Sequence, residues 1–398
     1  MKEYPCQRSL NGKRNMSRRS FVGSAATATA AAGTIGLPSW LSSAVAADPA
    51  DASLAMPGPY PGRVIEVAYP GSVARRQFKR ESVDAMLARG LTELTGADDA
   101  VSAWKSMFSP GDVVGVKVNP VGRPLAISNY VTVHAIVAGL RSAGVRARDI
   151  IVFERYQDEW EEAGYPKNLP DGVRGDTVCP EYDSQQLDIK GYDPDVYCTM
   201  DFVHARTRDP KDDRTRRSHL CEIVSKQVNK MVMIPVLKDH FAAGITGALK
   251  NMSHGMVNNV VRSHGTSDTN ATNVFVPTVC SMKPIREKAT LHIMDGLVGA
   301  FEDGPYGKAE NYKFTWPYGG LLFGTDPVAM DRIAWQIIDA KRAKENLPPV
   351  ASSGRTALDP LKRERFDVRQ PQHVLIAGGL GLGVSDLSKI EHRKIKLT

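Results

Sequence analysis

The densest group of chemically active side chains lies in the segment IPVLKDHFAAGITGALKNMSHG, residues 234–255. An apolar run ends with Lys238 and His240, and a glycine-bounded turn then leads to Lys250 and His254. Lys238 and His240 point to the same side if the run is extended, because side chains alternate along a strand. Lys250 and His254 are four residues apart and would share one face of a helix. The segment therefore brings two ammonium and two imidazole groups to one strand–helix junction.

One interpretation of this junction is an anion-binding site. A glycine turn that opens a helix presents backbone N–H groups without partners, and these groups suit a carboxylate or a phosphate. The two lysines would add charge-assisted hydrogen bonds. A surface helix with solvated lysines is the alternative, but the density of active groups at one junction argues against it. The predicted ligand-binding residues are Gly244, Thr246, Gly247, Lys250, Asn251 and Asn119.

A metal site is the second interpretation, and both interpretations stay open at this point. The predicted metal ligands are His240, His254 and Asp295, because imidazole and carboxylate groups are common ligands of divalent metals. The two histidines lack the H-E-x-x-H spacing, so this interpretation requires Asp295 to lie close to them. Glu302 and Asp303 follow in a loop bounded by Gly and Pro, where they could add carboxylates or only serve the turn.

Lys117 is the third feature that could carry chemistry. It stands inside the apolar run VVGVKVN, residues 113–119, where a charged side chain is costly unless it is paired or used. Arg123 lies in the loop that follows. A lysine that simply emerges at the tip of a strand is the alternative. The predicted catalytic residues, which would hold charge or move protons in one crevice, are Lys238, His240, Lys117 and Asp295.

Alternating strands and helices are expected to position these groups. The spacing of apolar residues predicts strands over 63–70, 111–119, 149–155, 230–237, 290–296, 319–326 and 373–379, and helices over 80–95, 129–143 and 326–342. Asp326 is predicted to cap the last helix, and Asp331 to place a charge in its first turn. Strands that alternate with helices imply a parallel sheet with right-handed crossovers.

The expected fold class is therefore α/β, with a mostly parallel central sheet flanked by helices. Residues 157–225 break the rhythm, being rich in Asp, Arg, Pro, Gly and Tyr, and we expect a long irregular insertion there. Residues 63–398 are predicted to form a single large α/β domain.

The first 46 residues have the pattern of an export signal. Arg18 and Arg19 form a twin-arginine pair with Phe21 at a fixed offset, and an Ala-rich run leads to Ala44-Val45-Ala46. The pattern predicts the twin-arginine (Tat) export machinery as a partner, cleavage near Ala46, and a periplasmic or other extracytoplasmic location. A retained N-terminal anchor is the alternative. Residues 47–62, rich in Ala, Pro and Gly, are expected to be a linker.

Charge and cysteine usage narrow the function classes. Six of the 51 basic and one of the 44 acidic side chains lie within residues 1–46, so the rest of the chain carries a net charge of +2. That balance gives no electrostatic basis for binding nucleic acid. No pair of cysteines has C-x-x-C spacing, so we expect no iron–sulfur cluster within this chain. Disulfides and free thiols both stay open for Cys179, Cys198, Cys221 and Cys280.

These landmarks together resemble the bacterial and archaeal proteins grouped as domain of unknown function 362. The resemblance extends over about residues 110–390, and its most distinctive part is the central K-x-H…TGALKN block. The matching residues are Lys117-Val118-Asn119, Ile234-Pro235, Leu237-Lys238, His240, the run from Gly244 to Asn251, Asp295-Gly296, Gly304-Pro305 and the run from Thr325 to Asp331. The resemblance implies an α/β domain. Many relatives carry ferredoxin-type cysteine clusters, which implies redox work, but this sequence lacks those clusters.

The sequence thus predicts an exported enzyme with one central crevice, dependent on a metal or another cofactor and acting on a small anionic molecule. The cofactor is unknown, with a divalent metal as one candidate, and the resemblance adds redox chemistry with a partner protein. The alternative is a non-catalytic periplasmic binding protein for a carboxylate or phosphate ligand.

Overall fold

The computed structural model describes residues 54–74, 77–181, 186–203, 209, 211–264, 271–306, 312–351 and 371–398. These residues belong to one compact unit, Ala44–Thr398. The predicted export signal and the first part of the predicted linker lie outside the described residues. No helix among the described residues is long and apolar enough to cross a membrane.

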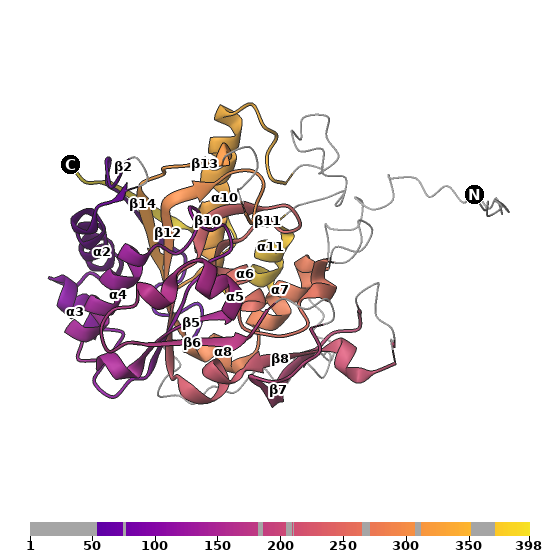
Figure 1. The fold of residues 1–398 in the computed structure, drawn as a ribbon. Helices are drawn as coiled ribbons and strands as arrows, with labels where there is room; N and C mark the ends of the chain where they lie inside the picture. Colours follow the sequence, from indigo (N-terminus) through magenta and orange to yellow (C-terminus); the bar gives the residue numbers. More distant parts are fainter. Residues whose placement is uncertain are drawn as a thin grey trace, which may run out of the picture. The chain divides into compact units, whose positions relative to one another are not determined.

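A large sheet runs through this unit (Figure 1). Its strand order is β15-β1-β14-β12-β9-β4-β5-β6. The strands are β1 (Arg63–Ala68), β4 (Val114–Lys117), β5 (Ile150–Tyr156), β6 (Arg174–Cys179), β9 (Lys230–Met233), β12 (Ala289–Ala300), β14 (Gly320–Gly324) and β15 (Glu391–Lys396). From β12 to β6 every neighbouring pair is parallel, whereas β14 is antiparallel to both of its neighbours. A mostly parallel α/β sheet is therefore confirmed.

Helices cover both faces of the sheet, as the alternation of apolar residues along the strands requires. Ile150 and Val152 of β5 belong to one core, and Ile151 and Phe153 to the other. The first core holds α2 (Arg80–Thr95), α3 (Ala100–Lys105) and α4 (Tyr130–Ser142). The second holds α6 (Gly247–His254), α7 (Thr272–Cys280), α8 (Lys283–Lys288), α10 (Pro327–Lys344) and α11 (Gln372–Gly379).

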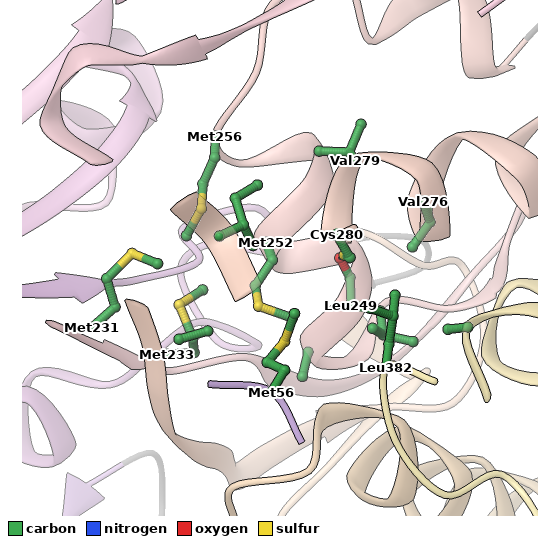
Figure 2. Close-up of a cluster of buried hydrophobic side chains, with 14 of the residues drawn as sticks. Met56, Met231, Met233, Leu249, Met252, Met256, Val276, Val279, Cys280 and Leu382 are labelled. Atoms are coloured by element: carbon green, nitrogen blue, oxygen red, sulfur yellow. The ribbon is translucent and has the colours of Figure 1, made fainter. Parts of the chain in front are cut away.

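Methionine side chains fill the space between β9 and α6 (Figure 2). They come from β9 (Met231, Met233), from α6 and the residues after it (Met252, Met256), and from the N-terminal segment (Met56). Flexible thioethers fill irregular gaps that branched side chains would leave open. This packing fixes one face of α6 and leaves its other face to carry polar residues.

The structure departs from the sequence prediction at two places. Part of the segment 157–225 is regular: α5 (Gln157–Glu162) is followed by β6, which extends the sheet beside β5, and β7 (Tyr192–Thr199) pairs with β8 (Arg217–Cys221). The strand predicted over 373–379 is wrong, because this apolar run forms α11 and packs on α7 and α10. The last strand is instead β15, which lies parallel to β1 at the edge of the sheet.

Candidate functional site

A cavity of about 290 Å³ lies beyond the carboxyl ends of the central parallel strands. Its walls include Lys117 at the end of β4, Glu154 near the end of β5, and Lys238 of β10 (Val236–His240), which follows β9. In the sheet, β5 is the neighbour of β4 on one side, and β9, which comes later in the chain, is its neighbour on the other side. Ligands of open α/β sheets bind where the strand order reverses in this way.

The structure brings most of the predicted site residues to this cavity. Eight of them line it, namely Lys117, Asn119, Lys238, His240, Thr246, Lys250, Asn251 and His254. Asp295, Gly244 and Gly247 are not among the lining residues. The segment 234–255 and the strand end around Lys117, which are far apart in the sequence, therefore meet at one place.

A chain of hydrogen bonds fixes the orientation of two amide side chains in the cavity wall. The Lys238 ammonium can only donate, and it lies 2.8 Å from Asn119 Oδ1. Asn119 Nδ2 must then donate to Asn251 Oδ1, at 3.1 Å. The Asn251 Nδ2 group is left buried and without a hydrogen-bond partner among the described residues. Asn251 thus presents a donor that no described residue satisfies.

The His240 ring is also a donor. Its Nδ1 accepts hydrogen bonds from the backbone N–H groups of Ala242 and Ala243, at 3.0 and 3.2 Å. Burial, reinforced by the Lys250 ammonium, holds the pKa of His240 well below its ordinary value. The neutral ring must then carry its proton on Nε2. A ligating histidine has the opposite arrangement, with a bare nitrogen towards the metal and the other N–H donating, so His240 is poorly set up to bind one.

Lys250 has no hydrogen-bond or salt-bridge partner among the described residues, although it is buried. Burial, together with the nearby Lys238 ammonium, lowers its pKa to about 7. Burial likewise lowers the pKa of Lys238 to about 7. Lys238 bonds only to neutral oxygens, those of Asn119 and the Val121 backbone. Within the described part of the chain, neither ammonium is bonded to a carboxylate.

Lys117, in contrast, is neutralised within the protein. Its Nζ lies 2.7 Å from Glu154 Oε2, and both side chains are buried. The other carboxylate oxygen of Glu154 accepts the backbone N–H of Arg155. The Arg155 guanidinium is satisfied by Tyr192, Gln186 and the backbone oxygen of His254. Lys117 therefore holds the ends of β4 and β5 together and has little capacity left for a ligand.

Glu159 is a cavity residue that the sequence prediction missed. It lies on α5, its Oε1 is 3.3 Å from Arg123 Nη1, and its Oε2 is buried without a hydrogen-bond partner among the described residues. Burial, together with the nearby Glu154 carboxylate, raises its pKa to about 7. The only signal in the sequence was the acidic run QDEWEE, inside a segment expected to be irregular.

His254 has both ring nitrogens occupied by serine hydroxyls. Nε2 lies 2.8 Å from Ser263 Oγ and Nδ1 lies 3.1 Å from Ser253 Oγ. Ser263 Oγ also donates to the backbone oxygen of Val260, so it accepts from His254. This network holds the ring in place and leaves neither nitrogen for a metal.

Asp295 serves the start of α4 instead of the cavity. Its Oδ2 accepts the backbone N–H of Asn129 and the hydroxyl of Thr132, both at 2.8 Å, and its Oδ1 accepts the N–H of Leu297 at 2.9 Å. The predicted set of His240, His254 and Asp295 is therefore not assembled. No group of three or more His, Cys, Asp or Glu side chains in the described part of the chain is placed to hold a metal ion.

The start of α6 is not the predicted anion cradle either, because a carboxylate of the protein already occupies it. Asp331 of α10 accepts the backbone N–H groups of Ala248 and Leu249, at 2.5 and 3.0 Å. Gly247 permits this approach, since a Cβ there would lie 2.2 Å from Asp331 Oδ1 and the backbone φ is +58°. Asp331 was predicted as a first-turn charge of its own helix. Asp326, in contrast, caps α10 as predicted.

Gly244 and Thr246 were also predicted as ligand-binding residues. Gly244, with a φ of +78°, begins β11 (Gly244–Ile245), which pairs back onto β10. Thr246 lines the cavity, and its hydroxyl donates to the backbone oxygen of Asp239 at 3.2 Å.

The cysteines of the described residues, Cys179, Cys198, Cys221 and Cys280, are free thiols.

Comparison with known proteins gives a family match and distant structural similarity. The profile of the domain of unknown function DUF362 matches residues 114–336, a span that contains all the predicted site residues. No curated protein matches the chain. A crystal structure of a Thermotoga maritima protein is similar at 10% identity and a TM-score of 0.38, over 68% of this chain and 60% of that chain. The chain thus spans about three-fifths of that protein's length, and a similarity this low carries no argument about function.

Proposed function

The chain belongs to the domain of unknown function (DUF362) family, and from this premise we propose that it is an enzyme acting on a small anionic molecule bound in the cavity between β4, β5 and β10. The single observation that carries the proposal is Lys250, a buried ammonium group with no partner among the described residues. A buried charge of this kind costs several kcal/mol unless something neutralises it. A bound anion would do so.

The neighbouring groups support an anion over a cation. Lys238, His240 and Asn251 line the cavity, and the hydrogen bonds on their other sides leave Lys238 Nζ, His240 Nε2 and Asn251 Nδ2 as donors. The predicted helix-start cradle does not contribute, because Asp331 occupies it. The anion would therefore be held by side chains alone.

Catalysis is favoured over simple binding by the proton-exchanging groups in the cavity. Lys238, Lys250 and Glu159 all have pKa values near 7, for which burial is the main cause. A general acid or base works best when its pKa lies near the working pH. A binding protein would gain nothing from an acid with a raised pKa beside the ligand. The proposal uses no metal at His240, His254 or Asp295.

The test of anion binding is titration calorimetry with sodium sulfate on three proteins. We expect the wild type to bind sulfate and Lys250→Met to bind at least tenfold more weakly, because a charge-assisted hydrogen bond contributes about 1.5–3 kcal/mol. Lys344→Met is the matched control, since Lys344 is exposed on α10 and away from the cavity. Equal sulfate affinity in Lys250→Met and the wild type would remove the basis of the proposal.

The test of catalysis uses Glu159→Gln, which keeps the shape of the side chain but cannot exchange a proton. We expect this variant to retain sulfate binding while losing turnover of any phosphorylated or carboxylated compound that the wild type converts, followed by ¹H and ³¹P NMR. If the wild type binds such compounds and converts none of them, the non-catalytic binding protein becomes the better description.

A further inference from the structure

The charge balance of the cavity points to a ligand with two negative charges, and this inference rests on the function proposed above. Lys117 is matched by Glu154, at 2.7 Å. Four basic side chains (Lys117, Arg155, Lys238 and Lys250) and two acidic ones (Glu154 and Glu159) line the cavity, an excess of two positive charges when Glu159 is ionised. Among the described residues, Lys238 and Lys250 are bonded to no carboxylate. A monoanion would leave one of the two cavity ammonium groups buried and unmatched, which is costly in a region of low dielectric.

The donor groups also match the shape of a tetrahedral oxyanion. A carboxylate presents two oxygens in one plane, whereas a phosphoryl group presents three terminal oxygens that point in three directions. The cavity offers donors from two elements, Lys238 and His240 on β10 and Lys250 and Asn251 on α6. The two ammonium groups have no acceptor atom, and the acceptor atoms of His240 and Asn251 are already used within the protein. Three oxygens can use these donors more fully than two.

The rest of the lining indicates an organic part beyond the anionic group. Val121, Phe241, Val260 and Pro305 line the cavity together with Tyr156. Its volume of about 290 Å³ is at the small end of known ligand pockets, yet roughly ten times the share of one liquid water molecule. Inorganic phosphate alone would leave much of this space unfilled.

We propose that the ligand is a phosphate monoester or phosphonate of a small organic molecule, whose dianionic group is held by Lys238, Lys250, His240 and Asn251. Glu159 also lines the cavity. Its carboxyl group would be protonated beside a dianion and could donate a hydrogen bond through the otherwise unsatisfied Oε2.

The experiment is a calorimetric panel on the full chain at pH 6.5 with phenyl phosphate, inorganic phosphate, malonate and benzoate. We expect phenyl phosphate to bind at least tenfold more tightly than benzoate or malonate, and more tightly than inorganic phosphate. Asn251→Asp is the sharpest variant, because it keeps the shape and the acceptor for Asn119 but turns the unsatisfied donor into a charged acceptor. We expect it to lose phenyl phosphate binding, while Lys344→Met retains it. Circular dichroism and a melting curve establish that each variant is folded.

The outcomes separate this inference from the proposed function. If malonate or benzoate binds as tightly as phenyl phosphate and Lys250→Met abolishes that binding, the site is anionic but not specific for a tetrahedral group, and only this inference is overturned. If inorganic phosphate binds as tightly as the monoester, the organic part is overturned. If no member of the panel binds, or if Lys250→Met and Asn251→Asp bind as the wild type does, the proposed function fails as well.

Discussion

Two buried lysines of this protein stand in opposite electrostatic situations. Lys117 forms a buried salt bridge with Glu154, whereas Lys250 has no anionic partner among the described residues. Removing one member of a buried pair leaves the other charge uncompensated, but removing an unpaired charge eliminates a cost. The same substitution should therefore change stability in opposite directions at the two positions.

We predict that Lys250→Met raises the free energy of unfolding by about 1–4 kcal/mol at pH 6, whereas Lys117→Met lowers it by about 3–5 kcal/mol. The folded-state pKa of Lys250, about 7, lies below its ordinary value of 10.5, so between these values the unfolded chain binds more protons. The gain in Lys250→Met should be full below pH 7 and shrink as the pH approaches 10. Urea denaturation at pH 6 and pH 9 measures both effects, and a destabilised Lys250→Met would show that Lys250 has a partner.

Sulfate affinity should depend on pH through the same lysines. Sulfate stays doubly charged from pH 6 to pH 8, so any change must come from the protein. Lys238 and Lys250 are mostly protonated below a pKa of about 7 and mostly neutral above it. We predict that affinity falls roughly tenfold per participating lysine between pH 6 and pH 8. Calorimetry at five pH values tests this, and an affinity that is flat or rises with pH contradicts it.

The sequence placed Lys238, His240, Lys250 and His254 together because they follow the local periods of two and about four residues. It failed for Asp295, since β12 is buried on both faces. A strand of this kind reads as one continuous apolar run, and nothing local tells which side chain points to which face. Asp295 points towards α4. Glu159 was missed because its helix lies in a segment without apolar periodicity.

At the scale of elements, α6 depends on a residue far along the chain. Asp331 of α10 accepts hydrogen bonds from the first N–H groups of α6. Helix α6 also carries Lys250 and Asn251, which line the cavity. A packed methionine core holds its other side (Figure 2). The position of the cavity donors thus rests on an α10–α6 contact that no local pattern in residues 234–255 could reveal.

We predict that Asp331→Ala lowers the free energy of unfolding by about 2 kcal/mol, because two buried backbone N–H groups lose their acceptor. Sulfate affinity should fall as well, since Lys250 and Asn251 follow the start of α6. Gly247→Ala should reproduce both effects, because its Cβ would displace the same carboxylate. Asp386→Ala is a matched control, as Asp386 caps an exposed 3₁₀ turn remote from the cavity. Unchanged stability in Asp331→Ala would contradict the capping role.

The prediction of helices and strands succeeded where apolar residues recur at a regular spacing over a long segment. It failed where the segment is short or the spacing is not regular. The helix over 80–95 coincides with α2, whose buried face recurs at Val83, Leu87, Leu91 and Leu94. The run HVLIAGG is too short and too uniformly apolar for either period to decide, and packing against α7 makes it a helix. Strand β15, EHRKIK, is mostly charged because it borders the sheet, and charged edges give a weak strand signal.

At the scale of the whole molecule, the sheet joins the two ends of the described chain. Strand β1 pairs in parallel with β15, which lies more than 300 residues further along. The sheet is therefore complete only when the C-terminal segment has been made, and pairing over such a distance is slow. A chain of this kind would be exported most safely after folding. The twin-arginine route carries folded proteins, and it is the route proposed from residues 1–46.

We therefore predict that replacing both Arg18 and Arg19 with lysine keeps the protein in the cytoplasm of a bacterial host that has the Tat machinery. The wild type should appear in the periplasmic fraction, shortened to a chain that begins near Ala47, because Ala44-Val45-Ala46 has the small residues of a cleavage site. Arg14→Lys is the matched control, since it lies in the same basic segment but outside the pair. Fractionation followed by N-terminal sequencing decides the matter. Export of the double variant, or a wild type that stays uncleaved in the cytoplasm, would remove the export proposal, whereas anion binding by the purified chain would be unaffected.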